Sequence, residues 1–246
     1  MNKNNWTAII PAAGKSSRFD KSKNKIFFLY KKKSILEHMI NKISNITTKI
    51  IIVINKRDYH EAKNISKKFK KKNDIQYVFQ NIANGMATAI EIGLRKTSTK
   101  FFYTIWCDQI GLSPKTVKET IQYHEKSNFI ASFPAARIKN NYTLVEKNKL
   151  NHLKKIYQSR EEKLSKNSGL NDCGFFCCDT FFFKKNLKKL ISSKKIVSKK
   201  TREHDFIYAL NYFAKSNKIK VKITKNKIDT FGINFKKDIK KLKNIS

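Results

Sequence analysis

Residues 6–18 read WTAIIPAAGKSSR, an apolar run that leads into a loop of small residues and cations. The run at 6–11 predicts a short buried strand, because consecutive apolar side chains suit a strand that is covered on both faces. In the loop, the small residues 11–14 allow a ligand to approach the main chain, and Lys15 and Arg18 add positive charge. This order favours a ligand site at the carboxyl end of a first strand.

Outward from this stretch, apolar runs alternate with amphipathic segments through the first half of the chain. Ser34 and Glu37 form a capping box, and Ser113-Pro114 is typical of a helix start. Further strands are predicted at 49–54, 75–79, 101–106 and 128–133, with helices at 34–46, 58–72, 85–96 and from 113 onward. We therefore expect an α/β fold with an open, mostly parallel, Rossmann-like sheet flanked by helices.

The second half has a less regular pattern. It predicts a hairpin at 143–146 and 150–157, a strand that runs into a helix at 173–183, a helix at 201–216, a strand at 219–224 and a last helix at 234–242. We interpret this half as an extension of the same sheet with a small β-rich insertion beside the substrate. The whole chain, 1–246, is expected to form a single domain.

The net charge is +36, from 54 Lys and Arg residues against 18 Asp and Glu. Only six of the basic residues are arginine, and the lysines are spread along the chain, so we expect a solvated surface rather than a nucleic-acid face. Such a field favours small anionic substrates. The sequence has no apolar run of about 18 residues and no pattern of a secretory leader, and its four cysteines suggest no disulfide framework. We expect a cytoplasmic protein.

Five segments, in order, resemble motifs of the sugar-1-phosphate nucleotidyltransferases, which have the MobA-like NTP transferase fold. The first is AIIPAAGKSSRF at 8–19, similar to the first-loop signature A-A-G-x-G-x-R-M. The others are NKIF at 24–27 (P-K-x-L), QNIANGMATA at 80–89 (Q-x(4)-G-T-x-x-A), WCD at 106–108 (G-D) and FGIN at 231–234 (G-V-N). The chain is also similar in length to the uridylyltransferase domain of bacterial N-acetylglucosamine-1-phosphate uridyltransferases.

The resemblance implies a Mg²⁺-dependent transfer of a nucleotidyl group from an NTP, first of all UTP, to a sugar 1-phosphate. An NDP-sugar and pyrophosphate would be the products. About residues 1–135 would form the nucleotide-binding half and about 136–246 the acceptor-binding half. No acetyltransferase domain is expected, and the oligomeric state is left open.

Carried over to this sequence, the motifs assign a role to each matching residue. Arg18, Lys25 and Asp108 would be catalytic, and Asp108 and Asn234 would hold Mg²⁺, which prefers oxygen ligands. Nucleotide binding would involve Pro11, Ala12, Ala13, Gly14, Lys15, Gln80, Gly85 and Met86. The Gln80 amide has both a donor and an acceptor, which match the edge of uracil.

The acceptor would meet Trp106, Thr143, Gln158 and Asp172. Here the sequence departs from the family, because sugar-binding members have Gly, Glu and Asn where this chain has Thr143, Gln158 and Asp172. Ser16 also replaces the second glycine of the first loop, and Met86 replaces a threonine. The departures concentrate in the acceptor half, so the nucleotidyl transfer is expected to be retained while the acceptor stays open.

Three alternatives remain. A cytidylyltransferase that acts on a polyol or amino-alcohol phosphate would use the same motifs. A basic nucleic-acid-binding protein on the same fold would lose affinity steeply with salt. A catalytically silent relative would bind nucleotide without turnover.

Overall fold

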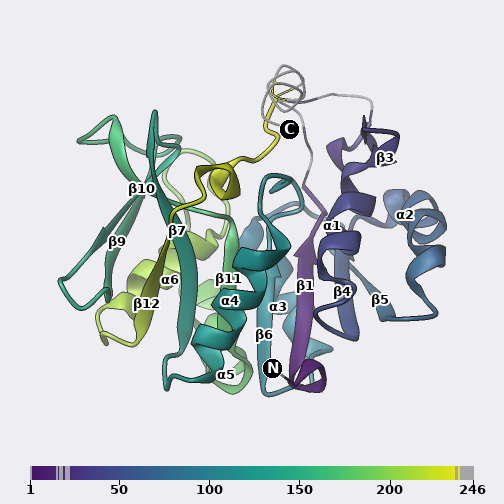
Figure 1. Ribbon diagram of the computed structural model, residues 1–246, viewed down its shortest axis with the longest axis horizontal. Helices are drawn as coiled ribbons and strands as arrows, with labels where there is room; N and C mark the ends of the chain where they lie inside the picture. The colour runs from purple at the N-terminus through teal and green to yellow at the C-terminus, as the bar shows by residue number, and fades with distance from the viewer. Residues whose placement is uncertain (1, 15, 17–18, 20–22, 236–237, 239–246) are drawn as a thin grey trace.

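The computed structural model describes residues 2–14, 16, 19, 23–235 and 238. These residues form a central sheet of eight strands in the order β10-β7-β11-β6-β1-β4-β5, with β12 added beside β7 (Figure 1). The first four members, in chain order, are β1 (Trp6–Pro11), β4 (Lys49–Ile54), β5 (Asp74–Phe79) and β6 (Phe101–Ile105). They are mutually parallel, with β1 at the centre between β4 and β6.

The second half of the chain extends this sheet. Its strands are β7 (Ala131–Lys139), β10 (Ser168–Asp172), β11 (Phe175–Asp179) and β12 (Ile219–Thr224). Strand β11 is antiparallel to both β6 and β7, and β12 is parallel to β7. A separate two-stranded hairpin, β8 (Thr143–Lys147) and β9 (Leu153–Gln158), lies outside the main sheet, and β2 (Leu29–Tyr30) pairs with β3 (Lys33–Ser34). The expected sheet and the expected β-rich insertion are both confirmed.

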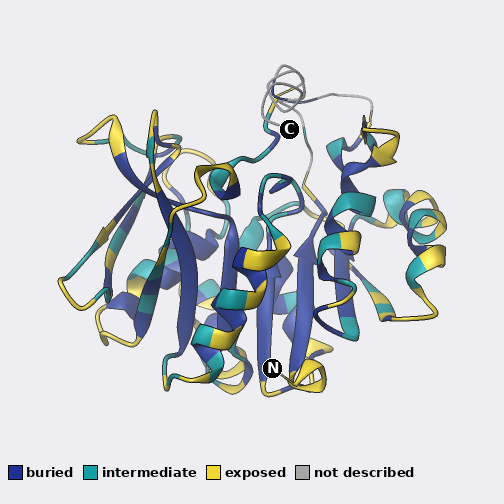
Figure 2. Cartoon of the chain, in the orientation of Figure 1, coloured by how far each residue is buried: buried dark blue, intermediate teal, exposed yellow. Residues whose placement is uncertain are grey.

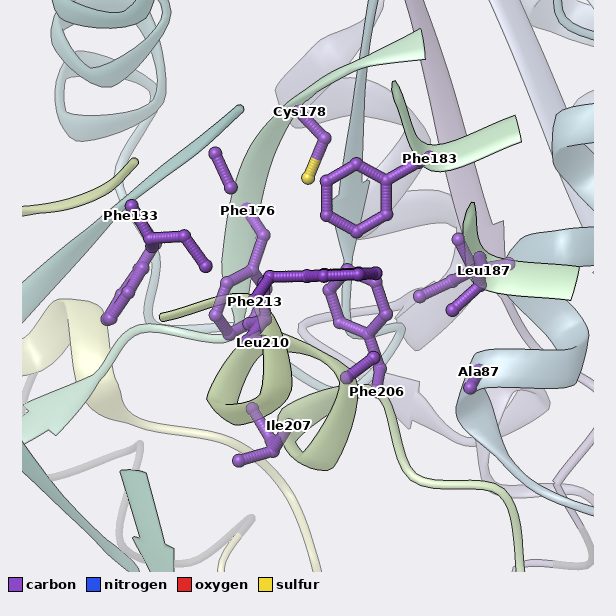
Figure 3. Close-up of a cluster of buried hydrophobic side chains, with 14 of the residues drawn as sticks. Ala87, Phe133, Phe176, Cys178, Phe183, Leu187, Phe206, Ile207, Leu210 and Phe213 are labelled. Carbon is purple, nitrogen blue, oxygen red and sulfur yellow. The ribbon is translucent and has the colours of Figure 1, made fainter. Parts of the chain in front are cut away.

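Helices cover both faces of the sheet. One hydrophobic layer packs α1 (Ile35–Ile43), α2 (Tyr59–Ser66) and α4 (Pro114–Glu125) against it, and a second packs α3 (Met86–Arg95), α5 (Thr180–Ser192) and α6 (Phe206–Ala214) against the other face. Figure 2 shows the central strands buried between these layers while the outer faces of the helices are exposed. In the second layer, Phe176, Phe183, Phe206 and Phe213 gather into one aromatic cluster (Figure 3). The cluster joins α5 and α6 to β11.

Short 3-10 turns complete the chain: η1 (Lys3–Asn5), η2 (Lys25–Phe27), η3 (Lys56–Asp58), η4 (Lys67–Phe69) and η5 (Lys227–Thr230). The predicted caps are confirmed, because the Ser34 hydroxyl accepts from Glu37 N and the Ser113 hydroxyl accepts from Thr116 N. In the described residues, no helix has the length and apolar character needed to cross a membrane.

Several predicted boundaries were wrong. The helix expected at 201–216 begins only at Phe206, because Asp205 caps it. The strand expected at 128–133 is β7, which begins at Ala131 and continues to Lys139. The helix expected at 58–72 breaks into η3, α2 and η4. The last predicted helix, 234–242, lies mostly outside the described residues.

Candidate active site

The loops that follow the parallel strands meet at one edge of the sheet and surround a cavity of about 530 Å³. Every described residue with a predicted site role lines this cavity. They are Pro11, Ala12, Ala13, Gly14, Lys25, Gln80, Gly85, Met86, Trp106, Asp108, Thr143, Gln158, Asp172 and Asn234. The predicted catalytic Arg18 and the predicted phosphate ligand Lys15 lie outside the described residues. The motifs, up to 223 positions apart in the chain, therefore converge on one space.

The Asn24 side chain holds the loop after β1 in place through hydrogen bonds. Its side-chain amide donates to Ala12 O (3.2 Å) and to Asp58 Oδ2 (3.0 Å), and its carbonyl oxygen accepts from the Ser16 hydroxyl (3.0 Å) and from Ile26 N (3.3 Å). Asn24 is 3% exposed, so both ends of its amide are committed to this network. It ties the loop after β1 to η2, which begins with Lys25.

Ser16 stands at the position where the family has its second glycine, and its φ is +53°. That left-handed conformation favours glycine, because a Cβ crowds the main chain there. The hydrogen bond from Ser16 to Asn24 offsets part of this cost. The left-handed backbone at this position explains why the family has a glycine there, and this chain adopts that conformation with a serine.

Lys25 and Asp108 form an ion pair in the floor of the cavity. Lys25 Nζ also donates to Ile233 O at 3.3 Å, next to Asn234 in the chain. The two side chains are 19% and 18% exposed, so they face the cavity with limited access to water. The contacts of Lys25 join the motifs NKIF, WCD and FGIN, and the pair places a cation beside a carboxylate.

Asp108 and Asn234 lie on adjacent segments. Ile233 N donates to the main-chain oxygen of Asp108 at 2.9 Å, and both residues line the cavity. A carboxylate and a carboxamide oxygen are the hard donors that Mg²⁺ takes, with water and phosphate oxygens filling its other positions. Among the described residues, no group of three or more His, Cys, Asp or Glu side chains is placed to hold a metal without such outside ligands. The donor set therefore fits a metal that arrives with a phosphate.

Gln80 follows β5 and lies at the other end of the cavity. Its Nε2 donates to Asn84 Oδ1 (2.7 Å) and to Gly85 O (3.2 Å). The amide nitrogen is therefore used within its own loop, and Oε1 is the atom that can meet a base. This corrects the expectation that Gln80 offers both a donor and an acceptor.

The loop around Gly85 is held against the turn before α6. His204 N donates to Asn84 O (2.8 Å), and Ala87 N donates to His204 O (3.0 Å). The His204 ring is hydrogen-bonded to the Thr88 hydroxyl at 2.9 Å. The proposed base loop and the acceptor half are thus one connected structure.

One wall of the cavity, which the motifs predict to meet the acceptor and which we call the acceptor wall, begins with Thr143 and Asp172 at the ends of β8 and β10. The Thr143 hydroxyl donates to Asp172 Oδ2 at 2.6 Å, and Gly174 N donates to the other carboxylate oxygen at 2.8 Å. Burial raises the pKa of Asp172 above its usual value, and these two hydrogen bonds oppose the shift. The Asp172 carboxylate is therefore held in place as a hydrogen-bond acceptor and has little contact with water.

Gln158 continues this wall through Asp205 and Arg160. Gln158 Nε2 donates to Asp205 Oδ2 (3.0 Å), and Arg160 donates to Gln158 Oε1 (3.1 Å) and to Asp205 Oδ2 (2.5 Å). The other oxygen of Asp205 caps α6 by accepting from Ile207 N at 2.7 Å. Asp205 thus both caps a helix and supports the acceptor wall.

The family profile of the MobA-like NTP transferase domain matches residues 8–170. The chain belongs to this family. It is therefore a nucleotidyltransferase, as the five motifs implied, while the closer likeness to the uridylyltransferase domain stays a prediction.

Similar proteins agree with this assignment. A curated relative, the 2-C-methyl-D-erythritol 4-phosphate cytidylyltransferase of Thermosipho melanesiensis, is 40% identical over 67 residues; these span 27% of this chain and 30% of the relative's length. Two solved structures share the fold. A candidate glucose-1-phosphate thymidylyltransferase from Bacillus anthracis, in complex with sucrose, has a TM-score of 0.74 at 15% identity and covers 98% of this chain and 94% of its own. The 4-diphosphocytidyl-2C-methyl-D-erythritol synthase of Anaerococcus prevotii has a TM-score of 0.69 at 17% identity and covers 99% of both chains.

Sequence reasoning missed two polar residues of this MobA-like NTP transferase, Asn24 and Arg160. Asn24 stands where the family has the proline of P-K. Its importance lies in its hydrogen bonds to distant residues such as Asp58, and the sequence alone does not show these partners. Arg160 is one of the six arginines in a chain dominated by lysine, and that scarcity was a usable signal. The turn at 201–205 also contributes to the site, because Thr201, Glu203, His204 and Asp205 line the cavity.

Proposed function

We propose that this MobA-like NTP transferase moves a pyrimidine nucleotidyl group from an NTP to the phosphate of a small hydroxylated acceptor. The observation that carries the proposal is the place of the Lys25–Asp108 pair. It lies in one cavity with a small-residue loop, a base loop and a polar acceptor wall. On this reading, residues up to about 135 serve the nucleotide and the rest serve mainly the acceptor.

In the reaction, an acceptor phosphate oxygen forms a bond to the α-phosphorus while the bond from that phosphorus to the pyrophosphate oxygen breaks. The nucleophile is already an anion, so no general base is needed. Catalysis then depends on positioning and on stabilising negative charge. Lys25 supplies the cation nearest to Asp108, and the main chain at Ala12–Gly14 supplies a surface that phosphates can approach.

Asp108 and Asn234 would hold Mg²⁺ through their side-chain oxygens. When bound, the ion would neutralise charge on the phosphates. Asn24 fixes η2, which begins with Lys25, by accepting a hydrogen bond from Ile26 N.

A pyrimidine is compatible with the base loop, where Gln80 can offer an acceptor. Its Oε1 can accept from N3–H of uracil or from the 4-amino group of cytosine. UTP with a sugar 1-phosphate is the first candidate pair, from the motif order. CTP with a polyol phosphate is the second, supported by the cytidylyltransferase relative and by the departures at Thr143, Gln158 and Asp172.

The test is pyrophosphate release by the purified protein with Mg²⁺. UTP, CTP, dTTP, GTP and ATP are crossed against sugar 1-phosphates, polyol phosphates and amino-alcohol phosphates, beside Asp108→Ala. Turnover with one pyrimidine nucleotide, lost in the variant, supports the proposal. Turnover only with a purine nucleotide contradicts it, as does nucleotide binding without turnover for any pair. Salt-sensitive binding to nucleic acid that survives in Asp108→Ala would favour the nucleic-acid alternative.

A further inference from the structure

A buried polar cluster lies directly behind Asp108 and Asn234. It joins three parts of the chain: α1, the loop from Asp108 to the start of α4, and the segment from β12 to Asn234. The central residue is Asp229, which has no exposed surface. No motif of the sequence pointed to it.

Asp229 collects hydrogen bonds from both segments that carry the proposed metal ligands. Its Oδ1 accepts from Ser113 N (2.8 Å) and its Oδ2 accepts from the Thr116 hydroxyl (2.5 Å), both at the start of α4. Its main-chain oxygen accepts from Gln109 Nε2 at 3.0 Å, next to Asp108. The carboxylate therefore fixes the Asp108 loop to the segment that ends in Asn234.

Lys42 approaches the same loop from α1. Its Nζ donates to Leu112 O at 2.6 Å and to Ile110 O. Burial lowers the pKa of Lys42 to about 8, and the charge of Asp229 opposes that shift. Burial of the charged Lys42 side chain is thus unfavourable in free energy, and its hydrogen bonds fix two carbonyl groups of this loop.

The Asp108 loop and the segment that ends in Asn234 also lie too close together to admit a side chain between them. A Cβ on Gly111 would lie 2.1 Å from Ile228 O, and Gly111 N donates to Phe231 O at 3.0 Å. Ile233 N donates to the main-chain oxygen of Asp108 at 2.9 Å. A shift of either segment would therefore move Asp108 relative to Asn234.

We infer that Lys42 and Asp229 are positioning residues that set the separation of Asp108 and Asn234 and so the metal affinity of the nucleotide complex. This inference rests on the proposed function, since it needs these two side chains to hold a metal. Neither residue lines the cavity. Their effect would pass through the loop alone.

The experiment measures Mn²⁺ binding, as loss of the free Mn²⁺ EPR signal, in the full chain with saturating UTP or CTP. Nucleotide binding in EDTA is measured in parallel. For Lys42→Met and Asp229→Asn we expect Mn²⁺ affinity to fall at least about fivefold while metal-free nucleotide affinity changes less than about twofold. Ile121→Val, on the buried face of α4, is the control for a general loss of packing.

Each outcome bears on the inference. Unchanged Mn²⁺ affinity in both variants overturns it while leaving the proposed function intact, and so does an equal loss in Ile121→Val. A wild-type protein without metal-dependent nucleotide binding overturns the proposed function together with the inference. If Asp229→Asn does not fold, Thr116→Val removes one donor to the carboxylate and takes its place beside Lys42→Met.

Discussion

The main chains of Gly85 and His204 pass so close that a Cβ on residue 85 would lie 2.3 Å from His204 O. Gly85 also has a φ of +115°, a conformation that side chains oppose. Both constraints come from backbone, which cannot yield as a flexible side chain would. The glycine in the base loop is therefore required by the fold of this chain as well as by any ligand.

Gly85→Ala should destabilise the protein by roughly 2–4 kcal/mol and weaken nucleotide binding, because the loop must move away from His204. Gly14→Ala is the matched control, since a Cβ there would have no atom of the described residues within 4 Å. It should leave stability within about 0.5 kcal/mol of the wild type and still weaken triphosphate binding by crowding the cavity. Urea unfolding and nucleotide titration measure the two effects. Equal stability of both variants would contradict the prediction.

Lys25→Gln and Asp108→Asn should each lower kcat by roughly 10²–10³-fold, because each removes a charge beside the reacting phosphate. Lys23→Gln tests the specificity of this effect. Lys23 pairs with Glu61 at 2.8 Å, and both side chains are nearly half-exposed. Its loss should leave the rate within about twofold, since exposed ion pairs contribute little. Steady-state pyrophosphate release gives the comparison, and an equal fall in Lys23→Gln would point to general charge instead.

Asn24→Ala should destabilise the protein by about 1–3 kcal/mol, because Asp58 and the loop carbonyl group lose a buried partner. The loop would also lose its fixed shape, so triphosphate affinity should fall. Ser16→Gly removes one hydrogen bond to Asn24 and relieves the positive φ at the same time. It should be close to neutral in chemical unfolding. A Ser16→Gly variant as unstable as Asn24→Ala would show that the hydroxyl, and not the amide, supports the loop.

Asp172→Asn should raise the KM for the acceptor about tenfold or more and leave nucleotide affinity unchanged. The reason is that the carboxylate is held by Thr143 and Gly174 at the acceptor wall, away from the base loop. Asp179→Asn is the comparison, because that aspartate caps α5 through Phe182 N and does not line the cavity. Acceptor saturation curves for the three proteins provide the readout. A KM effect in Asp179→Asn of the same size would assign the change to stability.

His124 should make the protein sensitive to acid. Burial lowers its pKa from 6.5 to about 4, so the unfolded chain binds a proton between these values that the folded chain does not. The free energy of unfolding should therefore fall as pH drops from 6.5 to about 4, by about 3 kcal/mol from this residue. His124→Gln removes the titrating group, so its stability should change less over this window in urea unfolding at each pH. Parallel curves for the two proteins would refute the assignment.

Much of the fold could be predicted because its decisive segments are locally encoded. The run at 49–54 is β4 residue for residue, and Ser34 and Ser113 cap the helices that they were expected to cap. Strand β10 was missed, because SGLND at 168–172 has no apolar alternation and becomes a strand only through its pairing with β7. Its formation is decided by a distant partner, which local pattern cannot supply.

The candidate site likewise combines residues that local sequence predicts with residues whose role depends on distant partners. Most of the predicted site residues lie at the ends of strands or at the starts of helices, where the fold itself places them. Asn24 and Arg160 act through partners 34 and 45 residues away, and Asp229 bonds across more than 100 residues to α4. These supporting contacts depend on tertiary geometry, so only the structure reveals them.

The β8–β9 hairpin places Thr143 and Gln158 directly opposite one another in register. A one-residue slip in this pairing would turn one of the two side chains away from the cavity, because directly paired residues share a face and neighbouring positions on a strand face opposite sides. The tip of the hairpin exposes Leu150, and Asn151 O accepts from Val221 N at 2.9 Å, which ties the tip to β12. If Thr143 and Gln158 meet the acceptor as proposed, paired replacements at these two positions would reshape that wall of the cavity while the parallel strands β1, β4, β5 and β6 remain untouched.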